Sequence, residues 1–115
     1  MPCIQIKTNV KVSEKIAEII KKELGKDIAF FPGKTENWLM ITLEDECRIW
    51  FHGESGRPMA MVEVKIFGKQ VDSAGSQKMT AAICSLFQEQ LGVDPKDIYI
   101  RYVACMDWGW NNANF

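Results

Sequence analysis

The chain has 115 residues, of which 47% are hydrophobic and 25% charged, with a formal net charge of −1. This length predicts one domain over residues 1–115, and the near-neutral charge gives no basic surface for nucleic acid. No apolar run approaches the length of a membrane span, and the N-terminus lacks the pattern of a signal peptide. Four widely spaced cysteines and a single histidine form no metal-binding pattern. We therefore expect a protein of the cytoplasm, or one exported without a signal peptide, with free thiols and no partner among nucleic acids or membranes.

The first half of the chain predicts a strand, a helix, a second strand and a short third one. Residues 3–8 alternate between apolar and polar side chains, which indicates a half-buried strand. Ser13 suits the N-cap of an amphipathic helix, and Gly25 inside its pattern predicts a kink or an early end. Residues 38–43 predict a buried strand, and residues 48–51 a short one.

The second half repeats this plan. Residues 59–67 alternate and predict a long strand, and apolar spacing from about Ser73 predicts a helix closed by Gly92. Residues 98–103 predict another strand, and residues 108–115 a short aromatic tail.

The repeat predicts an α+β fold built from two tandem βαβ units. Right-handed crossovers would give a four-stranded mixed sheet with two helices on one face, plus the short strands. The other face would carry mixed side chains such as Gln5, Met61, Glu63 and Arg101. An uncovered mixed face and spare short strands favour an oligomer over a monomer.

Met1-Pro2 is the candidate for chemistry. Removal of Met1 would leave Pro2 with a secondary amine, and α-amino groups titrate at about 7.7 to 8 when unperturbed. An apolar pocket would lower this pKa further, which suits a general base near neutral pH. Taken alone, however, most Met-Pro starts have no chemical role.

Several further motifs join Met1-Pro2 in a family resemblance. In chain order they are Thr8-Asn9-Val10, Gly33-Lys34, Ile66-Phe67-Gly68-Lys69, Tyr99-Ile100-Arg101-Tyr102 and Trp108-Gly109-Trp110-Asn111-Asn112, with Phe115 near the end. With these motifs the whole chain resembles the macrophage migration inhibitory factor (MIF) family of the tautomerase superfamily. The resemblance implies a homotrimer whose sheets line a central barrel, with three active sites at subunit interfaces, each centred on Pro2.

The resemblance also implies roles for individual residues. Lys34 matches the family's pocket lysine, Phe67 stands where the family has an apolar pocket residue, and Trp110 matches the pocket tryptophan. Tyr99 matches a tyrosine supplied by a neighbouring subunit, and Arg101 stands where the best-known member has asparagine. A second departure is that Met59-Ala60-Met61-Val62 replaces the C-x-x-C of the mammalian protein, so thiol–disulfide activity is not expected.

These roles imply a cofactor-free keto–enol tautomerase of the phenylpyruvate type. Pro2 would move the proton, Lys34 would bind a carboxylate or enolate oxygen, and Arg101 would hold a carboxylate with its planar fork. Aromatic rings from Phe67, Tyr99 and Trp110 would form a slot for an aryl group, so the expected substrate is an enolisable aryl α-keto acid.

Other readings remain open at this point. Lys34 could be a solvated lysine, Arg101 could pair with Glu63 across the sheet, and Tyr99 and Trp110 could be interface packing. A cytokine-like or binding protein could use the same trimer, since fold does not fix function. Dehalogenation or decarboxylation of a small acid could also use the same proline.

Overall fold

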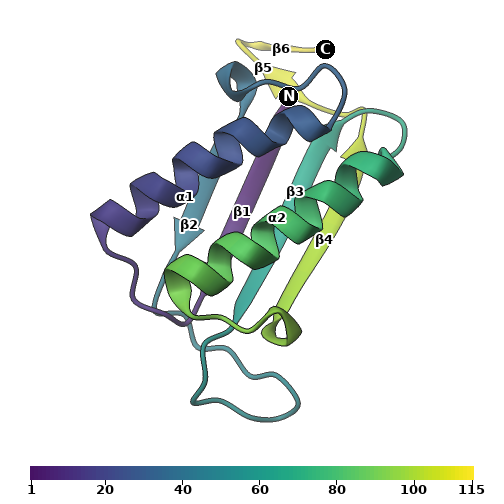
Figure 1. The fold of residues 1–115 in the computed structure, drawn as a ribbon. Helices are drawn as coiled ribbons and strands as arrows, with labels where there is room; N and C mark the ends of the chain where they lie inside the picture. The colour runs from purple at the N-terminus through teal and green to yellow at the C-terminus, as the bar shows by residue number, and fades with distance from the viewer.

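A four-stranded sheet with both helices on one face forms the body of the protein (Figure 1), and the computed structural model describes all residues from Met1 to Phe115. The strand order is β2-β1-β3-β4, in which β1 is parallel to β2, β3 is parallel to β4, and β1 and β3 are antiparallel. The two βαβ units predicted from the sequence are therefore confirmed. The strands are β1 Pro2–Thr8, β2 Met40–Glu44, β3 Ala60–Phe67 and β4 Ile98–Cys105.

Local side chains set the ends of both helices. Helix α1 spans Glu14–Asp27, and the Ser13 hydroxyl accepts a hydrogen bond from the Ile16 backbone N–H at 3.2 Å, as an N-cap should. Helix α2 spans Ser73–Leu91 and ends at Gly92, whose φ of 66° is the left-handed conformation that glycine adopts most readily.

Helix α1 passes through Gly25 and ends two residues later, so the expected early end is confirmed close to the glycine. The helix runs on to Asp27 and continues as a 3₁₀ turn, Ile28–Phe30. Gly25 is buried, and the carboxylate of Glu36 lies where a β-carbon would be. A β-carbon at this position would require the exposed Glu36 side chain to move.

The core lies between the sheet and the helices. Alternate residues of the two central strands, β1 and β3, face the helices and are buried, while the intervening residues of β3 are only partly buried. The main core side chains are Ile4, Ile6, Val62, Val64, Ile66, Ile20, Leu24, Met79, Ile83 and Phe87. The opposite face of the sheet has no helix over it and carries the mixed side chains that the sequence predicted (Figure 1).

Two predicted strands differ from the structure, and the predicted tail gains structure of its own. Trp38 lies in a 3₁₀ turn, Glu36–Trp38, and β2 begins only at Met40. Residues 48–51 form no strand, and only an isolated bridge joins Phe51 to Glu54. The aromatic tail folds back on itself as a hairpin, β5 Gly109–Trp110 and β6 Ala113–Asn114.

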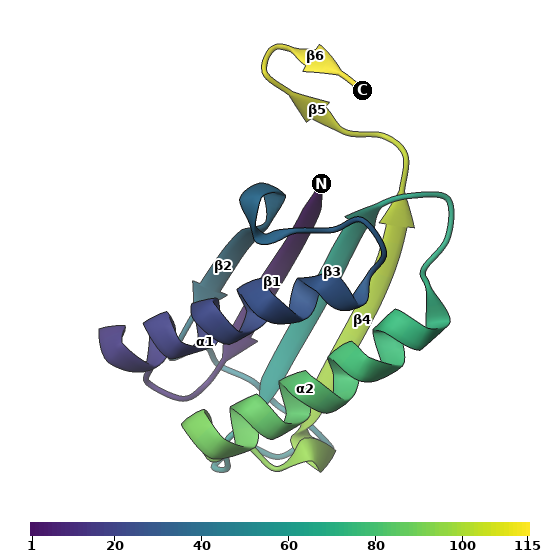
Figure 2. The same ribbon diagram turned by 45° about the horizontal axis from the view of Figure 1, so that its top comes forward.

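The two ends of the sheet carry different segments. The N-terminus of β1, the 3₁₀ turn that precedes β2, and the β5–β6 hairpin gather at one end, and the loop of residues 45–59 extends from the other (Figures 1 and 2). Neither helix is both long and apolar enough to cross a lipid bilayer.

Candidate active site

The start of β1 is held in the sheet by the residue that precedes it. Pro2 is buried and lies opposite Ile66 of β3. The backbone N–H of Phe67 donates a hydrogen bond to the Met1 carbonyl at 3.0 Å. Met1 thus adds one hydrogen bond to the pairing between β1 and β3, and its peptide bond makes the Pro2 nitrogen an amide.

Lys34 lies beside this N-terminus. Its Nζ donates a hydrogen bond to the Phe67 carbonyl at 2.8 Å and lies 5.8 Å from the centroid of the Phe67 ring. Burial lowers the pKa of the Met1 amine below its ordinary value of 8.0, and the positive charge of Lys34 lowers it further. The structure therefore brings Pro2, Lys34 and Phe67 together, as the resemblance implies.

Two aromatic pairs flank these residues. The rings of Phe67 and Phe115 lie 5.2 Å apart at 45°, and those of Trp38 and Trp110 lie 5.2 Å apart at 83°, an edge-to-face arrangement. Trp110 of β5 thus places its ring against Trp38, and Phe115, which follows β6, places its ring against Phe67. The β5–β6 hairpin lies at the end of the sheet that holds the N-terminus (Figure 2). Trp38 and Trp110 remain 51% and 54% exposed, so a ligand could still contact both.

Trp38 and Phe115 were not among the residues to which the sequence assigned a role. The sequence analysis placed Trp38 in a buried strand. Its position four residues after Lys34 could have identified it as a candidate site residue. Phe115 belongs to the tail motif, but its contact with Phe67 depends on the hairpin turn. In that turn Asn111 and Asn112 adopt positive φ values of 52° and 67°.

Tyr99 lies far from Pro2 within one chain. It is opposite Met61, whereas Pro2 is opposite Ile66, and five residues of strand span about 16 Å. Tyr99 is 61% exposed and packs against Phe51, with ring centroids 5.0 Å apart. It borders a cavity of about 200 Å³ lined by Ile49, Trp50, Phe51, Met59, Ala60, Met61, Asp97 and Tyr99.

Arg101 is also remote from Pro2 in the same chain. It lies on the uncovered face of the sheet, directly opposite Glu63 in the β3–β4 register. It forms no ion pair, because the Glu63 carboxylate is 3.4 Å from Lys65 Nζ instead. Arg101 and Glu63 therefore lie opposite each other, as an ion pair across the sheet would require, but they do not form that pair in this conformation.

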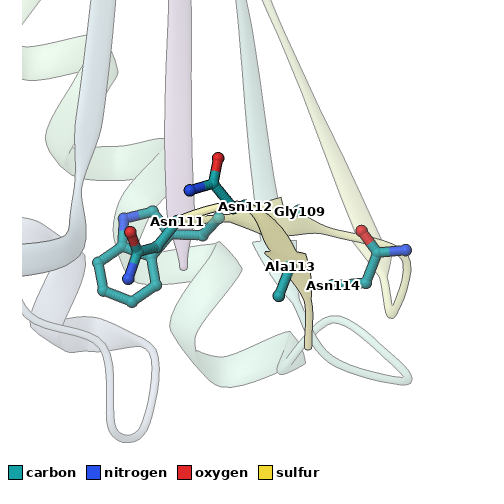
Figure 3. A pocket seen from close by; sticks show the side chains of 6 residues that line it. Gly109, Asn111, Asn112, Ala113 and Asn114 are labelled. Carbon is teal, nitrogen blue, oxygen red and sulfur yellow. The ribbon is translucent and has the colours of Figure 1, made fainter.

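One hollow of the surface lies along the hairpin and is not the candidate site. It has a volume of about 480 Å³ and is lined only by residues 109–114. The amides of Asn111, Asn112 and Asn114 point in different directions (Figure 3), whereas a binding site needs convergent polar groups. No group of three histidine, cysteine, aspartate or glutamate side chains is placed to hold a metal ion.

Comparisons with known proteins agree with this geometry. The family model described as Macrophage migration inhibitory factor (MIF) matches residues 1–115. The macrophage migration inhibitory factor of Meriones unguiculatus is 27% identical over 117 residues, which cover 100% of this chain and 99% of that protein. The crystal structure of Leishmania major MIF2 is 28% identical with a TM-score of 0.89, over 100% of this chain and 97% of that one. The homologue from Prochlorococcus marinus is 26% identical with a TM-score of 0.79, over 98% of both chains.

Because the family model matches the whole chain and these structures share its sheet and helices, the protein belongs to the macrophage migration inhibitory factor family of the tautomerase superfamily.

Proposed function

We propose that the protein is a cofactor-free keto–enol tautomerase in which Pro2, freed by removal of Met1, is the general base and then the general acid. The observation that carries this proposal is the lowered pKa of the N-terminal amine beside Lys34. Pro2 is more buried than Met1, so the same burial and the same cation act on its amine once it becomes the terminus. A neutral amine near pH 7 can accept a proton from the carbon next to a carbonyl.

Removal of Met1 has a second effect at this site. The Phe67 N–H donates to the Met1 carbonyl, so without Met1 this donor faces the site with no acceptor. Lys34 Nζ keeps two of its three donors free after its bond to the Phe67 carbonyl. A carboxylate or enolate oxygen placed between these groups would satisfy both of them, and this would stabilise the charge that develops as the proton leaves carbon.

The complete site needs a second copy of the chain. Tyr99 and Arg101 cannot reach Pro2 within one subunit, and both are exposed. The homotrimer proposed from the family resemblance would bring them to the Pro2 of a neighbour. A closed ring of three copies, each presenting its Tyr99 end to the next copy's Pro2 end, is a heterologous assembly that satisfies this requirement. The unpaired backbone of residues 48–51 and the exposed edge of β2 support it.

The walls of the site favour an aryl substrate. Phe67, beside the N-terminus, packs against Phe115, Trp38 packs against Trp110 at the same end of the sheet, and Tyr99 would add another ring from the neighbour. The proposed substrate class is therefore an enolisable aryl α-keto acid such as phenylpyruvate, with its carboxylate toward Lys34 and the neighbour's Arg101.

The test is the enol–keto conversion of phenylpyruvate by protein whose intact mass proves the loss of Met1. Turnover by this form supports the proposal. Processed protein that converts none of a panel of enolisable acids would refute it. A panel that includes small halogenated acids also tests dehalogenation at the same proline, which the positive charge of Arg101 would favour.

A binding or cytokine-like role is the second candidate, because the relatives carry the name macrophage migration inhibitory factor. Pro2→Gly separates the two roles, since loss of turnover with unchanged binding to a protein partner would show that binding does not use the amine.

The four unpaired cysteines suit a reducing compartment such as the cytoplasm.

A further inference from the structure

The Tyr99 ring makes few contacts, although the proposed function needs this ring in a defined position. Its one aromatic contact is Phe51, with the rings 5.0 Å apart at 71°. Phe51 belongs to a tight turn closed by two backbone hydrogen bonds with Glu54, of 2.9 and 3.0 Å. His52 and Gly53 at the tip of this turn have φ values of 57° and 71°. The turn pairs with no strand of the sheet, so something else must fix its position.

Arg57 connects this turn to the start of β4. Its Nε donates to Asp97 Oδ1 at 3.0 Å, and its two terminal nitrogens lie 3.4 Å from the Phe51 carbonyl and 3.5 Å from Glu54 Oε2. Asp97 precedes Tyr99 by two residues. The side chains of Arg57 and Asp97 are 32% and 14% exposed, so this ion pair is shielded from water far more than those on the helices.

The backbone of Arg57 is itself fixed. The Asn9 side chain donates from Nδ2 to the Arg57 carbonyl at 2.8 Å, and its Oδ1 accepts from the Met59 N–H at 2.8 Å. Asn9 follows the last residue of β1. One chain of hydrogen bonds therefore runs from the end of β1 through Arg57 to the carbonyl of Phe51 and the start of β4.

We propose that Arg57, held by Asp97, is a positioning residue that fixes the Tyr99 ring and so sets how tightly the neighbouring copy's site binds an aryl group. Arg57 would act through Phe51 and Asp97 and would not touch the substrate. The planar guanidinium contacts three acceptors through three separate nitrogens held in a rigid fork, whereas the donors of a lysine ammonium all radiate from one nitrogen. This proposal rests on the proposed function, in which Tyr99 serves the Pro2 of a second copy.

The first arm of the test needs no turnover. The chain has two tyrosines, Tyr99 and Tyr102, so protein labelled with 3-fluorotyrosine gives two fluorine resonances. Tyr102 is half-buried, and its hydroxyl lies 2.7 Å from Thr80 Oγ1 of α2, which makes it an internal reference. Arg57→Lys and Asp97→Asn should each shift or broaden the Tyr99 resonance and leave that of Tyr102 in place. An unmoved Tyr99 resonance, or equal changes in both, would overturn the proposal.

The second arm is a double-mutant cycle on phenylpyruvate turnover. Arg57→Lys should raise KM about tenfold with little change in kcat, well short of the roughly hundredfold that a 1 Å misplacement can cost. In a Tyr99→Ala background the same change should have almost no effect, since residues coupled through one network are not additive. Additive effects would show that Arg57 does not act through Tyr99. Lys26→Gln removes an exposed ion pair on α1 and should alter neither constant.

The two proposals fail in different ways. A processed wild-type chain that lacks turnover refutes the proposed function, whatever the fluorine spectra show. A wild type that turns over phenylpyruvate while its variants give additive effects refutes the role of Arg57 alone.

Discussion

Retention or removal of Met1 is the sharpest perturbation that the structure offers. While Met1 is attached, the Pro2 nitrogen is a tertiary amide and cannot accept a proton. The Met1 carbonyl also occupies the Phe67 N–H at 3.0 Å, which is the donor proposed for a substrate oxygen. We therefore expect the Met1-containing form to be folded and almost inactive.

The size of the effect follows from these two contacts. A positioned general base contributes about 10²- to 10⁴-fold to rate, so the Met1-containing form should be at least about a hundredfold slower. One backbone hydrogen bond contributes about 1 kcal/mol to stability, so this form should also be the more stable one. For a domain of this size that difference corresponds to a melting temperature higher by about 4 °C.

The assay compares two preparations whose intact masses differ by one methionine. Phenylpyruvate conversion is followed at equal protein concentration, and thermal unfolding is followed by circular dichroism. A faster processed form with a slightly lower melting temperature is the expected outcome. Similar turnover in the two forms would show that the Pro2 amine is not the base.

Three further predictions follow from the same structure. For the processed protein, kcat/KM should rise with pH through a pKa below 8.0, because the neutral amine is the active form. Lys34→Ala should raise that pKa, but not fully to 8.0, since burial is the larger cause of the shift and remains. A pH–rate profile of each form measures the pKa. Trp110→Ala should raise KM for phenylpyruvate more than KM for an enolisable acid that lacks an aryl group. Equal changes in KM for the two acids would show that Trp110 does not contact the aryl group. Phe87→Ala, at a fully buried position of α2, should cost about 3 to 5 kcal/mol in urea unfolding, whereas the exposed Glu89→Ala should cost under about 0.5 kcal/mol.

The main elements could be predicted because their patterns are local. Alternation marked β1 and β3, and the caps Ser13 and Gly92 marked where the helices begin and end. Gly25 indicated the region in which α1 ends, but the sequence pattern could not show that the Glu36 side chain lies against this glycine.

The candidate site was predictable only in part for a related reason. The family motifs indicated Pro2, Lys34 and Phe67, and the pairing of β1 with β3 places Pro2 opposite Ile66, next to Phe67. Trp38 was missed because a short 3₁₀ turn has no periodicity of its own. Residues 48–51 carry a strand-like sequence without forming a strand, because alternation alone does not show which strand a segment could pair with.

The position of the two chain ends limits how the protein can be handled in the laboratory. Both termini lie at the same end of the sheet (Figure 1), where the first residue covers Pro2 and the ring of Phe115 packs against Phe67. An affinity tag left on the N-terminus would keep the Pro2 nitrogen in an amide. A tag fused after Phe115 would lie close to the candidate site. Immobilisation or dye labelling through exposed lysines of α1, such as Lys22, would leave that end of the molecule free.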